Sequence, residues 1–398
     1  MLRSLPSPPN SKVAFVAGAN GISGHALIEH LIRTPHQEWS QIIITSRKPP
    51  PNYWVDPRVR FIAIDFLEEP REDVLAKLRS VCKEVTHAFF TSYVHNGDSS
   101  KLAEKNCPLW YNFLDAVDKA CPRLQRVNLQ TGGKHYAIGL QRFSTPCYED
   151  TPRYKGKGQE TIFYYKQEDD LFAIQKRRKT NPWHYSIIRP FGIIGFTPQF
   201  SGINSALCLA QYFLISRELR VCPRWPGNYN GWHQVEGESY APSVADMHVW
   251  AATTESAKDQ AFNHGNGDTV AWRFLWTLFA EYFGVSIAGA EPDAPGSSGK
   301  QQPQVTLAEW AKDKQAVWER LTDKYGGRAE AYQGGGFELL DWEFSPDEPG
   351  LVFATAVQKA RALGWSRMED SYRAWTAAFR SYENAGVLPV RESYSGEK

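Results

Sequence analysis

The amino-acid sequence predicts an α/β fold: a doubly wound parallel sheet, followed by a smaller and mainly helical C-terminal portion. Short β-branched runs alternate with longer segments of helical periodicity from residue 12 to about residue 195. Several of the short runs are apolar on both faces, which is typical of parallel strands that helices cover on both sides. Strands and helices that alternate in this way, joined by right-handed crossovers, form a doubly wound sheet.

The first half contains six predicted strands and four predicted helices. The strands are Lys12–Ala17, Gln41–Thr45, Val59–Ile64, Thr86–Thr91, Arg126–Leu129 and His184–Ile188. The helices are Gly24–Arg33, Glu72–Val81, Pro108–Ala120 and Glu160–Arg178. In the first helix, Leu27, Ile28 and Leu31 recur at the spacing that places them on one face.

The second half has a different pattern. Residues 200–260 mix helix with an irregular stretch, Cys222–Glu238, and Ala288–Gln302 has the Pro, Gly and Ser content of a surface loop. Further helices are predicted over residues 270–284, 304–325, 353–363 and 369–386. The predicted organisation is a flexible tail (1–11), a sheet domain (12–200), a mainly helical substrate-capping portion with segments that return to the sheet domain (201–390), and a tail (391–398).

Composition excludes several classes of protein. The 45 Lys and Arg nearly balance the 44 Asp and Glu, so the formal charge is +1. This balance argues against a broad basic surface for nucleic acid and against an acidic disordered chain. The 42% hydrophobic and 13% aromatic residues are enough to fill a sizeable core. A chain of 398 residues is therefore expected to fold as one large domain or two ordinary ones.

Cysteine, histidine and hydropathy patterns predict a cytosolic protein without a metal or membrane partner. The six cysteines form no CxxC pair, and the ten histidines include no HExxH motif. In a chain of this length, scattered cysteines indicate reduced thiols. No window approaches the ~20 uninterrupted apolar residues of a membrane span, and the best candidate, Asn204–Ile215, is short and contains Gln211.

A glycine-rich turn follows the first strand. The segment Gly18-Ala19-Asn20-Gly21-Ile22-Ser23-Gly24 has the spacing G-x-x-G-x-x-G and leads into the first helix. Such a turn lets the backbone pass close to a pyrophosphate at the positive end of the helix. Alone, a glycine triplet also fits an ordinary tight turn. Between strand one and helix one, it predicts a Rossmann-type dinucleotide site of the form usual in short-chain dehydrogenases/reductases.

The end of the second strand predicts which dinucleotide binds. An NAD site needs a carboxylate there, whereas this chain has Ser46, Arg47 and Lys48. Because Arg47 can pair with a 2′-phosphate, NADPH is the predicted cofactor; the alternative is a solvated basic turn. Asp65, at the end of the third strand, fits a contact with the adenine edge, or else a surface cap.

The usual catalytic pattern of that superfamily, Tyr-x-x-x-Lys, is missing from the expected helix. Its only match is Tyr394–Lys398, in a C-terminal tail expected to be frayed, so the match is attributed to chance. In its place, Thr131-Gly132-Gly133-Lys134-His135-Tyr136 follows strand five. Phe163-Tyr164-Tyr165 and Glu168-Asp169 begin the next long helix.

These two motifs resemble those of the progesterone 5β-reductase/iridoid synthase-like (PRISE) family, atypical short-chain reductases that act on enones. The resemblance covers roughly residues 12–390 and includes Thr86–Phe90, Arg189–Phe196, Trp225–Asn228, Trp250–Ala252, Ala261–Asn263 and Asn266–Asp268. It implies an extended short-chain dehydrogenase/reductase fold in which the sheet domain is an NADP-binding Rossmann domain. It also implies a homodimer and a small enone or enal as substrate.

Residue by residue, the resemblance implies Lys134 and Tyr164 as the catalytic residues, with Tyr165 as a packing residue or, alternatively, with the two tyrosines exchanged. A nearby ammonium is expected to make the tyrosine more acidic and to stabilise an enolate. The predicted cofactor-binding residues are Gly18, Asn20, Gly21, Ile22, Gly24, Ser46, Arg47, Asp65, Phe66, Ser92, Tyr93, Gln130, Thr131, Pro190 and Ile193.

The predicted function is therefore NADPH-dependent 1,4-reduction of an activated C=C bond. Two alternatives stay open: 1,2-reduction of a carbonyl by the same residues, and an NADP-binding regulator with an idle site. The chain departs from the family pattern at Ser46, where the family commonly has an arginine, at Tyr93, where it often has a tryptophan, and in the loop Ala137–Thr145. Two of these changes fall in the expected substrate pocket, so the substrate need not be a steroid or an iridal.

Overall fold

The computed structural model describes residues 11–51, 54–141, 145–198, 204–294, 303, 305–332, 336–346 and 352–394. The chain divides into two compact units. The first unit comprises Met1–Phe191, Ala241–His264 and Thr355–Arg367, and the second comprises Gly192–Tyr240, Gly265–Ala354 and Met368–Lys398. The domain limits expected from the sequence remain a prediction.

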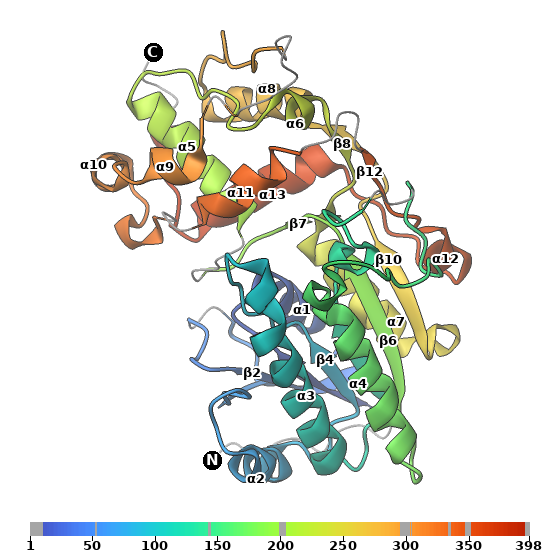
Figure 1. Cartoon of the computed structure of the whole chain (residues 1–398). Coiled ribbons are helices and arrows are strands. Elements are labelled where there is room, and N and C mark those ends of the chain that lie inside the picture. Colours follow the sequence, from blue (N-terminus) through green and yellow to red (C-terminus); the bar gives the residue numbers. More distant parts are fainter. Residues whose placement is uncertain are drawn as a thin grey trace. The chain divides into compact units, whose positions relative to one another are not determined.

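The first unit is built on a seven-stranded parallel sheet (Figure 1). Its strands are β1 (Lys12–Ala17), β2 (Trp39–Ser46), β3 (Val59–Ala63), β4 (His87–Phe90), β5 (Arg126–Gln130), β6 (His184–Pro190) and β10 (Gln260–His264). The spatial order is β10-β6-β5-β4-β1-β2-β3. The chain thus winds outward in both directions from β1, as expected of a doubly wound sheet. Each of the six predicted strands is present, with ends shifted by at most two residues.

Helices cover both faces of this sheet. The helices of the unit are α1 (Ile22–Arg33), α2 (Arg71–Val81), α3 (Leu102–Ala120), α4 (Phe163–Arg177), α7 (Ala241–Thr253) and α12 (Gln358–Ala362). Figure 1 shows α3 and α4 side by side in front of the sheet, and α1 packs with α7 on the other face. Phe15, Phe90 and Phe113 pack together between the sheet and α3, with ring centroids 5.0–5.8 Å apart.

Two helix starts differ from the sequence expectation. Pro108 favours the first turn of a helix, which predicted a start there, but α3 begins at Leu102 and contains Pro108. The earlier turn forms because Leu102 and Asn106 are buried and continue the apolar face of the helix. The helix predicted from Glu160 begins at Phe163 instead, after a separate 3-10 turn over Gln159–Thr161.

The second unit is mainly helical. Its helices are α5 (Ser205–Glu218), α6 (Tyr229–His233), α8 (Trp272–Phe283), α9 (Leu307–Ala311), α10 (Gln315–Tyr325), α11 (Phe337–Glu343), α13 (Ser371–Asn384) and α14 (Arg391–Tyr394). Two small sheets join β7 (Ile193–Ile194) to β9 (Ser239–Tyr240), and β8 (Val235–Glu236) to β11 (Val270–Ala271) and β12 (Val352–Phe353). Aromatic rings fill the core, among them Trp225, Trp272, Trp276 and Phe279.

Several expectations for the second half were wrong in detail. The helix predicted over residues 304–325 is two helices, α9 and α10. The helix predicted over 353–363 begins only at Gln358, after strand β12. The supposedly irregular Cys222–Glu238 contains α6 and β8. The C-terminal tail is ordered as far as Tyr394, which ends α14 and is 2% exposed, so it is not frayed there. Residues 1–10, 295–302 and 395–398 lie outside the described part of the chain.

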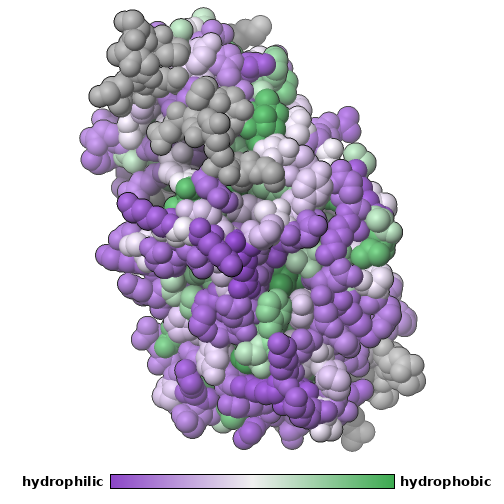
Figure 2. Space-filling model, turned by 45° about the vertical axis from the view of Figure 1, so that its right-hand side comes forward, coloured by the Kyte–Doolittle hydropathy of each residue, from purple (hydrophilic) through white to green (hydrophobic). Residues whose placement is uncertain are grey.

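The surface matches the balanced charge. The face in Figure 2 is mostly hydrophilic, and its hydrophobic side chains lie in small separate groups. Within the described ranges, no helix has both the length and the apolar character required to span a bilayer. The cytosolic location remains a prediction.

Candidate active site

The glycine turn after β1 has no room for side chains at two positions. Gly18 has a φ of +91°, and a Cβ atom there would lie 2.9 Å from the backbone nitrogen of Ser92. A Cβ atom on Gly24 would lie 2.0 Å from the carbonyl oxygen of Gly18. The first turn of α1 therefore packs directly against the end of β1, as a nucleotide-binding turn requires.

The N-terminus of α1 is suited to an anion. Gly21 is the N-cap residue and provides no side chain to cap the helix, and the first turn contains no acidic residue. The backbone N–H of Gly21 donates to the Gly18 carbonyl at 2.9 Å, which closes the turn. The N–H groups of Ile22, Ser23 and Gly24 have no intrahelical acceptor, as at any helix start. These donors and the positive end of the helix dipole fit a pyrophosphate.

The turn after β2 is attached to the glycine turn. The N–H groups of Gly18 and Ala19 donate to the Thr45 carbonyl at 3.1 and 3.2 Å. The Asn20 amide and the Ser46 hydroxyl both donate to the Lys48 carbonyl, at 2.8 and 2.6 Å. The exposed Arg47 side chain forms no ion pair with the described residues, so its guanidinium is available to an outside anion.

Asp65 and Phe66 have structural roles of their own. One Asp65 carboxylate oxygen accepts hydrogen bonds from the N–H groups of Leu67 and Glu68, at 2.9 and 3.2 Å. Asp65 therefore caps its turn, the alternative that the sequence left open, and the adenine contact remains a prediction. Phe66 is 5% exposed and its ring packs on Phe113, and its carbonyl oxygen accepts a 2.7 Å hydrogen bond from the Asn112 amide, so its contact with the cofactor remains a prediction.

Gln130 connects two helices across the end of the sheet. Its amide nitrogen donates to the Ser23 hydroxyl of α1 at 2.9 Å, and its amide oxygen lies 2.9 Å from the His248 ring of α7. Burial lowers the pKa of His248 to about 3, so this ring is neutral. The Gln130 side chain is thus engaged within the protein. Next to it, Thr131 is 5% exposed, and its hydroxyl oxygen has no partner among the described residues.

Lys134 lies in a 3-10 turn, Gly133–Tyr136, four residues after the end of β5. A Cβ atom on Gly133 would lie 2.8 Å from the Phe191 ring, and one on Gly132 would lie 3.1 Å from the Tyr164 hydroxyl oxygen. The turn therefore brings the backbone before Lys134 up to the Tyr164 hydroxyl. Lys134 is half-buried, and this burial lowers the pKa of its amine.

Tyr164 has a hydroxyl group available to a ligand. It lies in the first turn of α4, it is half-buried, and its hydroxyl makes no hydrogen bond to the residues that the structure describes. Burial and the neighbouring Tyr93 raise the pKa of Tyr164. The expected acidification by Lys134 is thus not observed, because burial disfavours the charged phenolate more strongly. Tyr164 is accordingly a neutral hydrogen-bond donor.

Tyr165 has the opposite environment. Its side chain is 6% exposed, its hydroxyl donates to the His135 carbonyl at 2.7 Å, and the same oxygen accepts from the Tyr154 N–H at 2.9 Å. Its ring meets the His135 ring edge to face, with centroids 5.2 Å apart. These contacts occupy the Tyr165 hydroxyl and favour Tyr164 over Tyr165 as the residue that meets a substrate.

The whole chain was compared with known proteins. The PRISE-like Rossmann-fold domain matches residues 14–389. The chain belongs to the PRISE-like family. Its relatives include the short chain dehydrogenase gsfE of Penicillium aethiopicum, 38% identical over 95% of this chain and 99% of the relative. They also include the 3-oxo-Δ(4,5)-steroid 5β-reductase of Arabidopsis thaliana, 30% identical over 95% and 94%. The (S)-8-oxocitronellyl enol synthase ISY1 of Nepeta racemosa is 31% identical over 93% and 92%.

Solved structures confirm the fold. The UDP-glucuronic acid 4-epimerase of Bacillus cereus, solved with NAD, has a TM-score of 0.61 at 12% identity and covers 94% of this chain and 99% of its own. The dTDP-glucose 4,6-dehydratase of Bacillus anthracis, also solved with NAD, has a TM-score of 0.62 at 10% identity over 94% and 97%. At this identity the likeness shows the Rossmann-type fold of the PRISE-like chain and nothing further.

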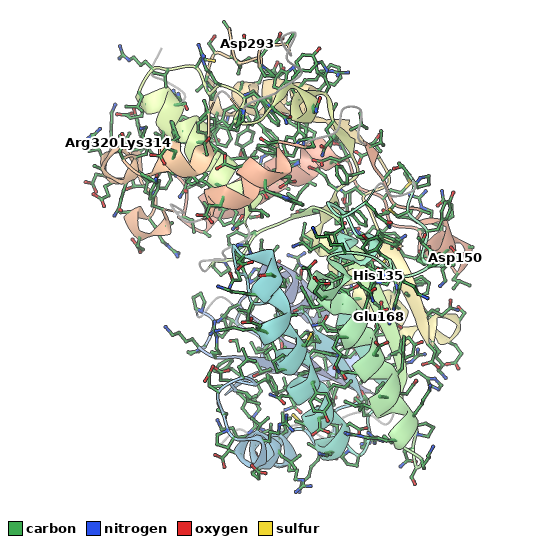
Figure 3. All side chains as sticks on the ribbon, in the orientation of Figure 1. His135, Asp150, Glu168, Asp293, Lys314 and Arg320 are labelled. Carbon is green, nitrogen blue, oxygen red and sulfur yellow. The ribbon has the colours of Figure 1, made fainter. Side chains whose placement is uncertain are left out.

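A buried ion-pair cluster supports both PRISE-like motifs (Figure 3). Figure 3 labels Glu168, on α4, and His135. One carboxylate oxygen of Glu168 pairs with Arg189 at 2.9 Å, and the other pairs with Arg153 at 2.9 Å. The ring nitrogen Nδ1 of His135 lies 3.3 Å from Glu168. Burial alone would raise the pKa of Glu168, but the neighbouring His135 ring and the arginine charges outweigh it and lower that pKa to about 2. Glu168 and Arg189 both stand in the family motifs, but their pairing cannot be predicted from the sequence.

Most of the predicted site residues lie in the first unit, at or just after the carboxyl ends of its strands: β1, β2, β3, β4, β5 and β6. Pro190 ends β6, and its carbonyl oxygen would lie 3.4 Å from a Cβ atom on Gly132. Ile193 is the exception, because it belongs to β7 in the second unit, so its contact with a cofactor remains a prediction. Among the described residues, no group of three or more His, Cys, Asp and Glu side chains is arranged to hold a metal ion.

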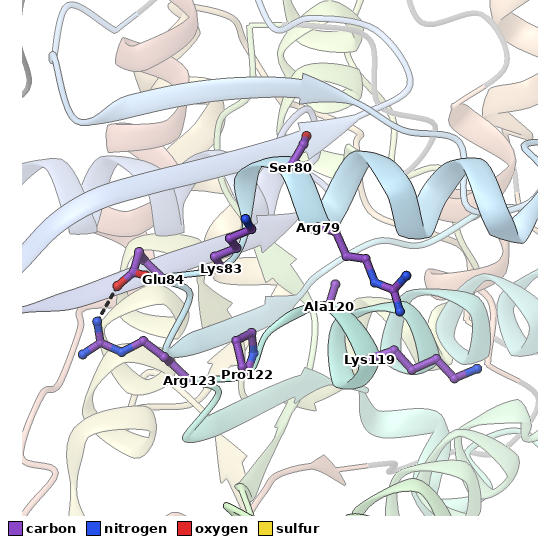
Figure 4. A pocket seen from close by; sticks show the side chains of 8 residues that line it. All are labelled: Arg79, Ser80, Lys83, Glu84, Lys119, Ala120, Pro122 and Arg123. Atoms are coloured by element: carbon purple, nitrogen blue, oxygen red, sulfur yellow. Dashed lines mark hydrogen bonds and ion pairs between the residues drawn. The ribbon is translucent and has the colours of Figure 1, made fainter.

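A basic depression lies elsewhere on the first unit (Figure 4). Its volume is about 760 Å³, and it is lined by Arg79, Ser80, Lys83, Glu84, Lys119, Ala120, Pro122 and Arg123. These residues end α2 and α3 or precede β4 and β5, so they lie at the amino ends of the strands. The candidate active site is at the carboxyl ends, and the depression is therefore no part of it.

Proposed function

We propose that this chain is an NADPH-dependent reductase of α,β-unsaturated carbonyl compounds. The observation that carries the proposal is the unengaged Tyr164 hydroxyl beside the turn that bears Lys134, on the same edge of the sheet as the glycine turn. Membership of the PRISE-like family makes the chain an oxidoreductase. Its relatives named as a steroid 5β-reductase and as 8-oxocitronellyl enol synthases support enone reduction in particular.

The residues for the cofactor fit NADPH. Gly18, Gly21 and Gly24 leave space for the pyrophosphate at the start of α1, and Arg47 is available to a 2′-phosphate. The Ser46 hydroxyl is engaged with the Lys48 carbonyl, so Arg47 is the residue we assign to the phosphate. When bound, the nicotinamide supplies a hydride, that is, a proton with two electrons. A Rossmann-type fold is expected to bind the dinucleotide at the carboxyl ends of its strands, with the pyrophosphate at the start of the first helix.

Tyr164 and Lys134 act on the oxygen of the substrate. As a hydride arrives at the β-carbon, the electrons of the C=C bond move toward the carbonyl and leave negative charge on its oxygen. The Tyr164 phenol keeps its proton because its pKa is raised, so it donates a hydrogen bond to this oxygen. The half-buried Lys134 ammonium stabilises the same charge. A solvent proton at the α-carbon then completes the reduction.

Reduction of a carbonyl carbon would use the same two residues, and the choice depends on which substrate carbon receives the hydride. An NADP-binding regulator would need no hydrogen-bond donor that faces a substrate. The unengaged Tyr164 hydroxyl is such a donor and therefore argues against this alternative. The homodimer remains a prediction.

Turnover of NADPH against a panel of enones, enals and saturated ketones tests the proposal. We expect consumption with enones or enals, saturated ketones or aldehydes as products, and losses on the order of 100-fold in kcat for Tyr164→Phe and for Lys134→Met. Tyr148→Phe is the matched control, because Tyr148 is 50% exposed and has no assigned role. Tight NADPH binding without turnover of any compound would favour the regulator.

A further inference from the structure

Tyr93 lies beside the candidate catalytic tyrosine. It follows Ser92 in the loop after β4, and its ring centroid is 6.1 Å from that of Phe163. The Phe163 ring is in turn 4.4 Å from the Tyr164 ring. The Phe163 ring therefore contacts two phenols, that of Tyr93 in the β4 loop and that of Tyr164 in the first turn of α4.

The backbone on either side of Tyr93 is fixed. Asn106, which is 1% exposed, accepts a hydrogen bond from the Val94 N–H at 2.9 Å and donates one to the Val94 carbonyl at 2.8 Å. On the other side, Ser92 lies against Gly18, where a Cβ atom would meet the Ser92 nitrogen at 2.9 Å. The position of Tyr93 is thus built into the loop and does not require a ligand to form.

Both phenols have unused hydroxyl groups. Neither the Tyr93 nor the Tyr164 hydroxyl makes a hydrogen bond within the described ranges, although Tyr93 is only 38% exposed. Burial raises the pKa of Tyr93 to about 12. The rings of Tyr93 and Tyr164 both pack on the ring of Phe163, which places the two phenols in one cluster. Both groups therefore present a neutral O–H donor at neutral pH.

We propose that Tyr93 is a second hydrogen-bond donor to the carbonyl oxygen of the substrate, so that Tyr93 and Tyr164 hold the developing enolate oxygen between two phenols. This inference rests on the proposed reductase function and adds a residue to it. A carbonyl oxygen has two lone pairs, and each preorganised donor stabilises the oxyanion more than the neutral carbonyl. The substrate class that fits is an enone or enal whose carbonyl oxygen is unhindered on both sides.

A purely aromatic role for Tyr93 makes a different prediction. If the ring only lines the pocket, phenylalanine would serve equally well, because it retains the contact with Phe163. The test must therefore remove the hydroxyl group and keep the ring. Tyr93→Phe does this at the proposed site, and Tyr148→Phe does it at an exposed position that serves as the control.

Two measurements on the full chain test the inference. With an enone that the wild type reduces, we expect Tyr93→Phe to lower kcat by on the order of 100-fold. The KM for NADPH should stay unchanged if the Tyr93 hydroxyl meets the substrate, and should rise if that hydroxyl instead binds the cofactor, as the sequence predicts for Tyr93. In the presence of NADP⁺, the oxyanion p-nitrophenolate, titrated by its absorbance, should bind Tyr93→Phe and Tyr164→Phe each about 10-fold more weakly than wild type, as for one lost hydrogen bond to a charged group.

The outcomes separate this inference from the proposed function. Wild-type kcat and nitrophenolate affinity in Tyr93→Phe would overturn the role of Tyr93 and leave the reductase proposal intact. A wild type that reduces no carbonyl compound would overturn the reductase proposal, and the nitrophenolate titration would still decide whether two phenols bind an oxyanion. A wild type that binds no nitrophenolate overturns the two-donor site.

Discussion

The Tyr165 hydroxyl donates a 2.7 Å hydrogen bond to the carbonyl oxygen of His135. Tyr165 directly follows Tyr164, and His135 directly follows Lys134. This one bond therefore joins the backbones that carry the two proposed catalytic side chains, across 30 residues of sequence. Tyr165 and His135 thus fix the positions of the two residues proposed to be catalytic.

This arrangement predicts different losses for the two tyrosines. Tyr165→Phe removes two buried hydrogen bonds, so it should lower the free energy of unfolding by about 1–3 kcal/mol, with a partial loss of kcat. Tyr164→Phe removes no hydrogen bond to the described residues and should lower kcat by on the order of 100-fold with little change in stability. Urea unfolding and steady-state kinetics of both variants measure this. The reverse pattern would show that the roles of the two tyrosines are exchanged.

Glu168→Gln should be strongly destabilising. It leaves Arg189, whose side chain is 5% exposed, without its buried carboxylate partner, and breaking a buried pair costs about 3–5 kcal/mol. Asp169→Asn is the matched control, since its side chain is 58% exposed and also pairs with Arg153. An exposed pair contributes about 0–1 kcal/mol. Equal unfolding free energies for the two variants would contradict the structural role of Glu168.

Glu168→Gln should also change how the free energy of unfolding depends on pH. The pKa of Glu168 falls from an ordinary 4.5 to about 2 in the folded chain. A depressed carboxyl pKa stabilises the fold above the unfolded value, and this stabilisation is lost as pH falls toward the folded value. The stability difference between wild type and Glu168→Gln should therefore shrink between about pH 4.5 and pH 2, as urea unfolding across this range would show. A difference that is constant over the range would exclude this linkage.

Gly24→Ala should disrupt the nucleotide site. Its Cβ would lie 2.0 Å from the Gly18 carbonyl oxygen, so the turn must open, at a cost of about 1–3 kcal/mol. We expect weaker NADPH binding, measured by fluorescence titration, together with a lower Tm. Gly237→Ala is the control, because Gly237 lies outside the nucleotide turn and its Cβ would meet no atom nearer than 3.6 Å. Similar NADPH affinities for the two variants would be inconsistent with the packed turn.

Arg47→Ala should change the choice of cofactor. If Arg47 binds the 2′-phosphate, the kcat/KM for NADPH falls by about 10-fold to 100-fold, the value of a charge-assisted hydrogen bond, and that for NADH is unchanged. Arg60→Ala, an exposed arginine on β3, serves as the control. Loss of both activities in parallel would argue against a role in phosphate recognition.

The strands of the sheet could be predicted because local pattern determines them. Lys12–Ala17 is continuous, β-branched and apolar, and its predicted bounds are those of β1. Strand β10 could not be predicted, because Gln260–His264 has polar residues at both ends and becomes a strand only by pairing with β6. Likewise, Pro108 is a strong local signal for a helix start, and the buried face of α3 overrides it.

In the candidate site too, local sequence patterns predict some features, whereas others depend on contacts between distant residues. The spacing of the glycines after the first strand made the glycine turn a candidate, and the resemblance to the family motifs made Lys134 and Tyr164 candidates, because each of these signals is local in the sequence. The partners of Gln130 and Glu168 lie 118 and 21 residues away along the chain, at His248 and Arg189. No sequence pattern predicts such contacts, including those of the Gln130 amide with Ser23 and His248. The contact of Gln130 with the cofactor remains a prediction.

The central claim is hydride transfer to the β-carbon of an enone, with Tyr164 donating to the carbonyl oxygen. NADPH deuterated at the transferable position of nicotinamide C4, followed by NMR of the product, tests it most directly. The account predicts deuterium at the β-carbon of a saturated carbonyl product, formed at equal rates by wild type and by Tyr148→Phe and on the order of 100-fold more slowly by Tyr164→Phe. Deuterium at the carbonyl carbon, or transfer at the wild-type rate by Tyr164→Phe, would contradict it.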